Sequence, residues 1–248
     1  MTTSGKRLES RRILVTGAAS GMGAAISRLF AAEGAQIALL DISDEAVGEV
    51  ASSIGQHAFP VDVADTAAVR QTVDKAADRL GGLDGLVNAA GILRQKPFED
   101  TDEADMAALI GVNLAGPINV TRAILPHLRA APSATIVNIA SMAGMRPPPG
   151  LAVYAATKAG LMAFGVALAG ELGAKIRLNT ICPGVIRTPM VQSHFDSGFM
   201  DDAALGRIAQ LGRAGTVDEI AATALFLSSD ESSYISAAAL AVNGGQLT

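Results

Sequence analysis

The sequence predicts an α/β fold in which a doubly wound parallel sheet of about seven strands is flanked by helices. Short apolar runs alternate with longer helical stretches along all 248 residues. Half of the residues are apolar, as expected for a sheet covered by helices on both faces. No linker, internal repeat or low-complexity segment divides the chain, so residues 1–248 are expected to form a single domain.

Each expected strand is a short apolar run that ends at a glycine or a polar residue. The runs lie at residues 12–16, 36–40, 57–61, 83–87, 135–139, 174–181 and 238–242. The helical stretches cover residues 24–33, 44–53, 66–80, 102–130, 151–172 and 216–228. Gly81-Gly82 should end the helix at 66–80, and Pro117 should kink or divide the helix at 102–130. Thr216 and Glu219 form a possible capping box for the last helix.

A glycine-rich turn follows the first strand and leads into a helix. Its residues are Thr16-Gly17-Ala18-Ala19-Ser20-Gly21-Met22-Gly23. Glycines let the backbone approach a ligand closely, while the N–H groups and dipole at a helix N-terminus attract a pyrophosphate. Asp41 ends the second strand, where a carboxylate can accept hydrogen bonds from an adenosine ribose. This order of elements favours a dinucleotide site over a purely structural turn.

The same carboxylate indicates which dinucleotide binds. Asp41 would repel a 2′-phosphate, which needs a cation nearby. The turn offers Ala18, Ala19 and Ser20 but no lysine or arginine, and Ile42 follows Asp41. We therefore expect NAD(H) rather than NADP(H).

Tyr154 and Lys158 are four residues apart on an expected helix. Their side chains should share one face, about 6 Å apart along the axis. A phenol with an ordinary pKa of about 10 keeps its proton at neutral pH, whereas a nearby cation favours the phenolate. The pair can act as an acid/base, although a surface tyrosine and lysine on an amphipathic helix would show the same spacing.

Right-handed crossovers place the carboxyl ends of all the strands at one edge of the sheet. The residues that stand out as chemically informative fall at that edge: Gly17 to Gly23, Asp41, Asp62, Asn88, Ser141 and Pro183. A single ligand site is therefore expected there.

Five motifs in this order resemble those of the short-chain dehydrogenase/reductase family over essentially the whole chain. They are Thr16-Gly17-x-x-x-Gly21-x-Gly23, Asn88-Ala89-Ala90-Gly91, Ser141, Tyr154-x-x-x-Lys158 and Pro183-Gly184. Ser141 precedes Tyr154 by 13 residues, the usual spacing in that family. The resemblance implies a Rossmann fold and hydride transfer between a nicotinamide and a substrate carbon.

The resemblance also implies a role for each matching residue. Tyr154 would exchange a proton with the substrate oxygen, and Ser141 would hydrogen-bond that oxygen. Lys158 would bind the nicotinamide ribose and lower the pKa of Tyr154. Asn113 would hold the helix geometry and a water that links Lys158 to solvent. The implied cofactor-binding residues are Gly17, Ser20, Gly21, Met22, Gly23, Asp41, Ile42, Asp62, Val63, Asn88, Ala89, Gly91, Tyr154, Lys158, Pro183, Gly184, Ile186 and Thr188.

Structural interpretations stay open for several of these residues. Ser141 could be an ordinary strand-end serine, and Asn113 could satisfy backbone groups at a helix bend. Asn88 could support the sheet, and Asp62 could cap the helix that follows it.

The leading functional hypothesis is an NAD-dependent alcohol dehydrogenase or ketone reductase. The alternative enzyme is a 3-oxoacyl-[acyl-carrier-protein] reductase, which usually prefers NADPH and often has a basic residue in the glycine turn. A dinucleotide-binding regulator without catalysis would be expected to lack Ser141, Tyr154 or Lys158, yet all three are present.

A largely apolar substrate is expected, covered by residues 190–213. The expected pocket residues are Ile92, Leu93, Met142, Met145, Leu151, Met190, His194, Phe195 and Phe199. Arg94, Lys96 and Arg146 lie close enough along the chain to weaken that expectation.

Composition argues against several other classes. A formal charge of −5 and a pI near 5.2 argue against a nucleic-acid surface. The longest apolar stretch, residues 159–169, is shorter than the ~20 residues of a membrane span. Three scattered histidines provide no metal-site spacing, so no metal is expected. One cysteine, Cys182, excludes an intrachain disulfide and fits a cytoplasmic protein.

The resemblance further implies a homotetramer, or a homodimer, formed through the helices at 102–130 and 151–172 and the C-terminal strands. Small residues on the second helix would permit close approach between copies, or would instead pack against the sheet. They are Ala155, Ala159, Ala163, Gly165, Ala167 and Ala169.

Overall fold

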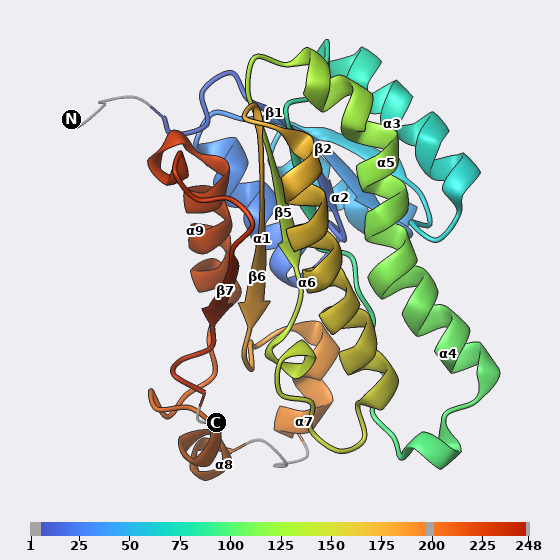
Figure 1. Cartoon of the computed structure of the whole chain (residues 1–248), viewed down its shortest axis with the longest axis vertical. Coiled ribbons are helices and arrows are strands. Elements are labelled where there is room, and N and C mark those ends of the chain that lie inside the picture. Colours follow the sequence, from blue (N-terminus) through green and yellow to red (C-terminus); the bar gives the residue numbers. More distant parts are fainter. Residues whose placement is uncertain (1–5, 197–200, 247–248) are drawn as a thin grey trace.

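The centre of the fold is a seven-stranded parallel sheet with the order β3-β2-β1-β4-β5-β6-β7 (Figure 1). This computed structural model describes residues 6–196 and 201–246, without the side chains of residues 193, 194 and 202. The strands are β1 (Arg12–Thr16), β2 (Gln36–Asp41), β3 (His57–Pro60), β4 (Gly85–Asn88), β5 (Ala134–Ile139), β6 (Ile176–Pro183) and β7 (Ala239–Val242). All seven expected strands are present, and the predicted doubly wound parallel sheet is confirmed.

Helices connect successive strands and cover both faces of the sheet. They are α1 (Gly21–Ala32), α2 (Asp44–Ser53), α3 (Thr66–Leu80), α4 (Glu103–Ile110), α5 (Gly116–Ala130), α6 (Ala152–Leu172), α7 (Gln192–Asp196), α8 (Asp202–Ile208) and α9 (Val217–Ser228). Gly81 ends α3 in a left-handed conformation with φ of 71°. The capping box between Thr216 and Glu219 is also confirmed.

The helix expected at 102–130 is divided directly before Pro117, as predicted. A π-helical turn, Gly111–Ala115, separates α4 from α5. Because Glu103–Ala130 is helical throughout, the missing N–H of Pro117 leaves a carbonyl of the preceding turn without its helical donor. The division takes the form of a local widening of the helix around Asn113.

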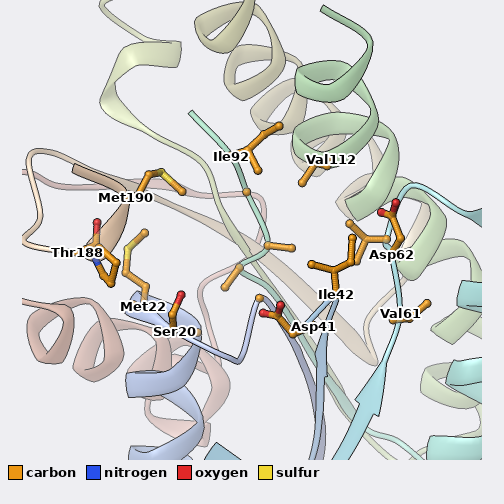
Figure 2. A pocket seen from close by; sticks show the side chains of 18 residues that line it. Ser20, Met22, Asp41, Ile42, Val61, Asp62, Ile92, Val112, Thr188 and Met190 are labelled. Carbon is orange, nitrogen blue, oxygen red and sulfur yellow. The ribbon is translucent and has the colours of Figure 1, made fainter. Parts of the chain in front are cut away.

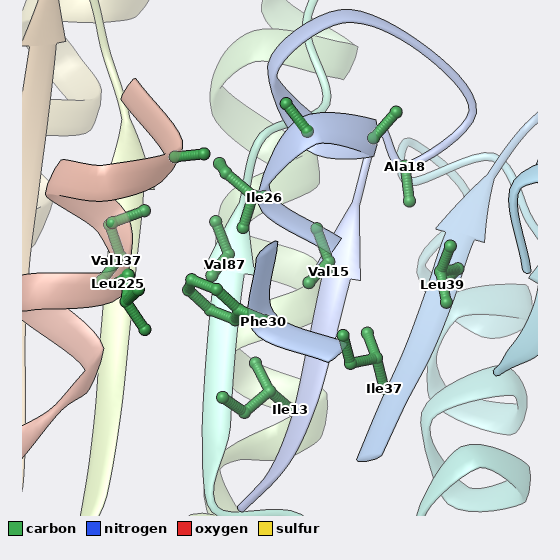
Figure 3. Close-up of a cluster of buried hydrophobic side chains, with 14 of the residues drawn as sticks. Ile13, Val15, Ala18, Ile26, Phe30, Ile37, Leu39, Val87, Val137 and Leu225 are labelled. Carbon is green, nitrogen blue, oxygen red and sulfur yellow. The ribbon is translucent and has the colours of Figure 1, made fainter. Parts of the chain in front are cut away.

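Successive side chains on each strand point to opposite faces of the sheet and pack into two apolar layers, one on each face. One layer joins Ile13 and Val15 of β1 to Phe30 of α1 and Leu225 of α9 (Figure 3). The opposite layer joins Leu14 to helices α3, α5 and α6. Because apolar residues run continuously along the central strands, both faces are buried and only the strand ends are open to a ligand.

Two helical regions have the length and composition of a membrane span. They are Glu103–Ala130, with 28 residues and a hydropathy of 1.3, and α6, with 21 residues and a hydropathy of 1.5. Both pack on the sheet, through Ile124 and Leu128 on α5 and Leu172 on α6. The sequence criterion overlooked them because it counted only uninterrupted apolar runs.

Candidate active site at the carboxyl edge of the sheet

A pocket of about 300 Å³ opens where the chain reverses its direction of winding. The chain runs outward from β1 through β2 to β3, and it returns on the other side of β1 as β4. Ligands of doubly wound sheets bind at this crevice, beyond the carboxyl ends of the strands. Figure 2 shows the pocket between Ser20 and Met22 on one side and Asp62 and Val112 on the other.

Most residues assigned to the cofactor from the sequence line this pocket. They are Gly17, Ser20, Gly21, Met22, Gly23, Asp41, Ile42, Asp62, Val63, Ala89, Gly91 and Thr188. Ala90, which belongs to the Asn88 to Gly91 motif, also lines the pocket. Sequence reasoning missed Val61, Val112 and Pro189, and it assigned Ile92 and Met190 only to the substrate side. Val61 and Pro189 each adjoin an assigned residue, so their position beside a motif was a usable signal.

Two glycines allow the turn to close around the pocket. A Cβ at Gly17 would lie 2.7 Å from Cα of Ala90, and its φ is +66°. A Cβ at Gly23 would lie 2.1 Å from the carbonyl oxygen of Gly17. Ser20, the N-cap of α1, makes no side-chain hydrogen bond to the first helical turn. The N-terminus of α1 is therefore available to an anion such as a pyrophosphate.

The Asp41 carboxylate is held at the pocket rim by two backbone amides. One oxygen accepts a hydrogen bond from the N–H of Ala19 at 3.0 Å, and the other accepts one from Ser43 at 3.1 Å. Ile42 beside it is 72% exposed and lines the pocket. The pocket lining in the described part of the chain contains no lysine or arginine.

Ser141, Tyr154 and Lys158 meet next to this pocket. The Ser141 hydroxyl lies close enough to the Tyr154 phenol to lower its pKa, and it also accepts a hydrogen bond from the N–H of Ala143 at 3.1 Å. The Nζ of Lys158 lies 5.8 Å from the centre of the Tyr154 ring and donates to the carbonyl of Ile139 at 3.0 Å. A Cβ on Gly91, which lines the pocket, would lie 3.5 Å from that Nζ. Gly91 therefore connects the pocket to these three side chains.

Burial shifts the pKa of both ionisable groups toward their neutral forms. It raises the pKa of the Tyr154 phenol, and the Ser141 hydroxyl beside the phenol lowers that pKa only in part. Burial lowers the pKa of Lys158 from 10.5 to about 8. The expectation that Lys158 lowers the pKa of Tyr154 stays a prediction, because burial is the largest influence on the phenol here. The ammonium contacts the Ile139 carbonyl, and burial dominates the phenol.

Asn113 is fully buried in the π-helical turn, and its amide binds the backbone of Ile92. Its Oδ1 accepts from the Ile92 N–H at 2.8 Å, and its Nδ2 donates to the Ile92 carbonyl at 2.9 Å. Both bonds hold the segment that follows Gly91. The side chain thus satisfies backbone groups at a helix bend, the structural interpretation that the sequence left open.

Asn88 lies below the pocket rather than in its lining. Its Nδ2 donates to Thr121 Oγ1 at 3.2 Å and to Oδ1 of Asn138, the residue opposite it on β5, at 2.9 Å. Asp62 does line the pocket, and Asp65 caps α3 instead. The structural interpretation of Asn88 therefore matches its contacts, and that of Asp62 does not.

Pro183, Gly184 and Ile186 are also absent from the pocket lining. Pro183 is the last residue of β6 and pairs with Val242 of β7. Ile186 is buried and bridges to Gly215. These residues anchor the segment that brings Thr188 to the pocket.

The loops on the expected substrate side carry exposed methionines and three cations, two of which are paired with a carboxylate. Met145 and Met190 are 42% and 43% exposed, whereas Met142 is buried. Asp105 forms ion pairs with Lys96 and, at 3.4 Å, with Arg94. Arg146 is exposed and makes no ion pair with another described residue. The side chain of His194 and all of Phe199 lie outside the described residues.

Comparison with known proteins places this geometry in a family. A family model described as enoyl-(acyl carrier protein) reductase matches residues 17–246. The chain is 40% identical to the 3-oxoacyl-[acyl-carrier-protein] reductase FabG of Thermotoga maritima, covering 96% of this chain and 98% of the relative. A Brucella melitensis structure described as short-chain dehydrogenase/reductase SDR:Glucose/ribitol dehydrogenase superposes with a TM-score of 0.93 at 34% identity. That alignment covers 98% of this chain and 99% of the other.

The chain belongs to the short-chain dehydrogenase/reductase family. The D-threitol dehydrogenase of Mycolicibacterium smegmatis is a further relative, 37% identical over 96% of this chain and 94% of its own length. Membership of the short-chain dehydrogenase/reductase family implies an oxidoreductase that uses a nicotinamide dinucleotide.

Proposed function

We propose that this protein interconverts a secondary alcohol and a ketone by hydride transfer, with NAD(H) as cofactor and Tyr154 as general acid/base. The observation that carries the proposal is the meeting of Ser141, Tyr154 and Lys158 beside a glycine-lined pocket. The uncapped N-terminus of α1 and the close approach at Gly17 fit a pyrophosphate. When bound there, the nicotinamide supplies the hydride acceptor or donor.

The side chains of the chain itself handle the substrate oxygen. The Ser141 hydroxyl hydrogen-bonds that oxygen and orients the reacting carbon. Tyr154 gives its proton to the oxygen during reduction and takes it back during oxidation. Lys158 binds the nicotinamide ribose through an ammonium held by the Ile139 carbonyl. Asn113 completes the set by fixing Ile92 and the backbone beside Lys158.

The proposed substrate is a neutral and largely apolar alcohol or ketone. Met145 and Met190 offer exposed apolar surface, and the cations of Arg94 and Lys96 are paired with Asp105. Residues 190–213 form the proposed cover, within the single domain of residues 1–248. The cations on the expected substrate side lie in the segments 92–97 and 142–150. Among the described residues of these two segments, Arg146 is the one cation without an ion pair that a substrate carboxylate or phosphate could meet.

NAD(H) is the proposed cofactor because of Asp41. Two backbone amides hold its carboxylate at the rim of the pocket, where it can accept hydrogen bonds from an adenosine ribose. The negative charge of this carboxylate would repel a 2′-phosphate on that ribose. The absence of a cation from the described pocket lining supports the same choice.

A 3-oxoacyl-[acyl-carrier-protein] reductase is the second candidate, because the FabG of Thermotoga maritima is 40% identical. Asp41 and the uncharged turn argue against its usual preference for NADPH. A regulator without catalysis is the third candidate. The presence of Ser141, Tyr154 and Lys158 together argues against it, because a protein that has lost catalysis would be expected to lack one of them.

The test is NADH and NADPH absorbance with the purified protein and a panel of alcohols, ketones and 3-oxoacyl thioesters. We expect turnover of neutral secondary alcohols or ketones with NAD(H), at a higher kcat/KM than with NADP(H). A clear preference for NADP(H) would overturn the cofactor assignment. Turnover confined to 3-oxoacyl thioesters would favour the reductase alternative. NADH binding without turnover of any compound would favour the regulator.

A homotetramer, or a homodimer, is proposed for the assembled enzyme, in the cytoplasm as the single buried Cys182 suggests. The helices expected to pair leave much apolar surface outside. In their most apolar 18-residue windows, 39% of the residues are buried for Glu103–Ala130 and 28% for α6. On α6, Val166 is 52% exposed and Ala163 and Ala167 are exposed.

Light scattering during gel filtration tests the assembly. We expect a mass of four or two chains for the wild type and a smaller species for Val166→Glu, which places a charge on the outward face of α6. Gly165→Ala is no suitable control, because a Cβ there would lie 2.9 Å from Thr180 Oγ1 inside the fold. A wild type that stays monomeric at assay concentration would refute the assembly.

A further inference from the structure

A second groove lies behind one wall of the cofactor pocket. It measures about 730 Å³ and runs between α1 and α9, which pack against each other (Figure 1). Gly21 and Pro189 line both cavities. A Cβ at Gly21 would lie 3.9 Å from Cδ of Pro189, so these two residues lie side by side between the two cavities. The remaining residues that line the groove are not shared with the dinucleotide site.

Arginines dominate the charge of this groove. Arg7, Arg28 and Arg187 line it together with one carboxylate, Asp218. The chain as a whole carries a formal charge of −5, whereas the charged residues that line the groove sum to a positive charge. A cationic cleft in an acidic protein concentrates anions from solution.

Two of these guanidinium groups have free hydrogen-bond donors. Arg7 is paired with Glu33 at 2.6 Å. Arg28 makes no side-chain hydrogen bond or ion pair with any residue that the structure describes. Arg187 lies 4.2 Å above the ring of Phe195, and its guanidinium likewise makes no hydrogen bond within the described ranges. Stacking on a ring leaves the donors at the guanidinium edge open to an anion.

The floor of the groove is apolar. It is made by Ala25 and Leu29 of α1 and by Val217 and Ala222 of α9. The N-terminus of α9 is closed by its own capping box, so the arginines provide the anion recognition. A ligand that satisfies both features needs an apolar body and an anionic head.

We propose that this groove binds a free amphiphilic anion, an alkyl or aryl chain that carries a carboxylate or a phosphate ester. The chain covers the apolar floor between α1 and α9, and the anionic head takes paired hydrogen bonds from Arg28 and Arg187. This site lies outside the proposed reaction and does not depend on it.

The test uses the full chain, with and without saturating NAD, and isothermal titration calorimetry. The probes are octyl phosphate, octanoate, inorganic phosphate and uncharged octyl glucoside. Arg28→Gln removes one of the two guanidinium groups proposed to bind the anionic head. Ala222→Trp places a large side chain in the apolar floor, where the alkyl chain of the ligand would lie. The matched control is Arg70→Gln, which removes the same charge from an exposed position on α3.

We expect saturable binding of octyl phosphate or octanoate that is about tenfold weaker in Arg28→Gln and unchanged in Arg70→Gln. Ala222→Trp should weaken the same binding, and inorganic phosphate should bind less tightly than its octyl ester. Any binding of octyl glucoside should be the same in Arg28→Gln and wild type. Absence of saturable binding, or equal affinity in wild type, Arg28→Gln and Ala222→Trp, would overturn the proposal. Because binding is measured directly, an inactive enzyme would not affect this result.

Discussion

Replacing Tyr154 with phenylalanine is expected to reduce kcat by about 100- to 10,000-fold while leaving NADH binding intact. The phenol hydroxyl is the only group lost, and the ring keeps its volume beside Lys158. Turnover is followed by NADH absorbance, and cofactor binding by NADH fluorescence. The two readouts separate loss of proton transfer from loss of the fold.

Tyr234→Phe provides the matched control. It is the other tyrosine of the chain, it is fully exposed, and its change removes the same hydroxyl. Its kcat should equal that of the wild type. If Tyr154→Phe kept the kcat of Tyr234→Phe, the general acid/base would have to be another residue.

Replacing Lys158 with methionine is expected to abolish turnover yet make the protein more stable at pH 7. Lys158 is 4% exposed, and burial lowers its pKa to about 8. Keeping this ammonium charged in the folded state at pH 7 therefore costs of order 3 kcal/mol. Losing the charge-assisted hydrogen bond to the Ile139 carbonyl offsets about 2 kcal/mol of the gain. The melting temperature should rise by about 2–4 °C.

The dependence on pH has a definite sign. Below about pH 8 the lysine is protonated in both folded and unfolded chains, so the full cost is present. Between about 8 and 10.5 the folded protein releases this proton while the unfolded chain keeps it, so the wild type gains stability relative to the variant. Melting curves at pH 7 and pH 9.5 should show the difference shrinking. Lys175→Met, at an exposed lysine, is the control. A variant less stable than wild type at pH 7 would contradict this account.

Much of the fold and the site could be predicted from the sequence, because both depend on local patterns. Seven apolar runs predicted seven strands, and the glycine turn with Asp41 predicted the crevice. Parallel topology then brought Ser141, Tyr154 and Lys158 to one edge. Spacing along a helix or strand is sufficient for inferences of this kind.

What the sequence could not show depends on contacts between distant residues. The π-helical turn is accompanied by the bonds from Asn113 to Ile92, 21 residues away. Lys96 loses its value as a substrate counter-charge because Asp102 and Asp105, at the start of α4, pair with it. Pro183 lies outside the pocket lining, at the end of β6 where it pairs with Val242 of β7. Each of these placements depends on a partner that no local motif identifies.

The amide pair below the pocket has a consequence for how the two central strands align. Asn88 and Asn138 face each other on β4 and β5, buried beside Thr121. A slip of one residue would set Asn88 against Val137 or Ile139 and break the bond between the amides. Asn138 Oδ1 would then lose its partner, at about 1–3 kcal/mol, whereas Asn88 Nδ2 would keep Thr121 Oγ1. The pair therefore disfavours pairing of β4 and β5 in another register. The register of these strands determines how far Ser141, after β5, lies from Gly91, after β4, along the strand direction.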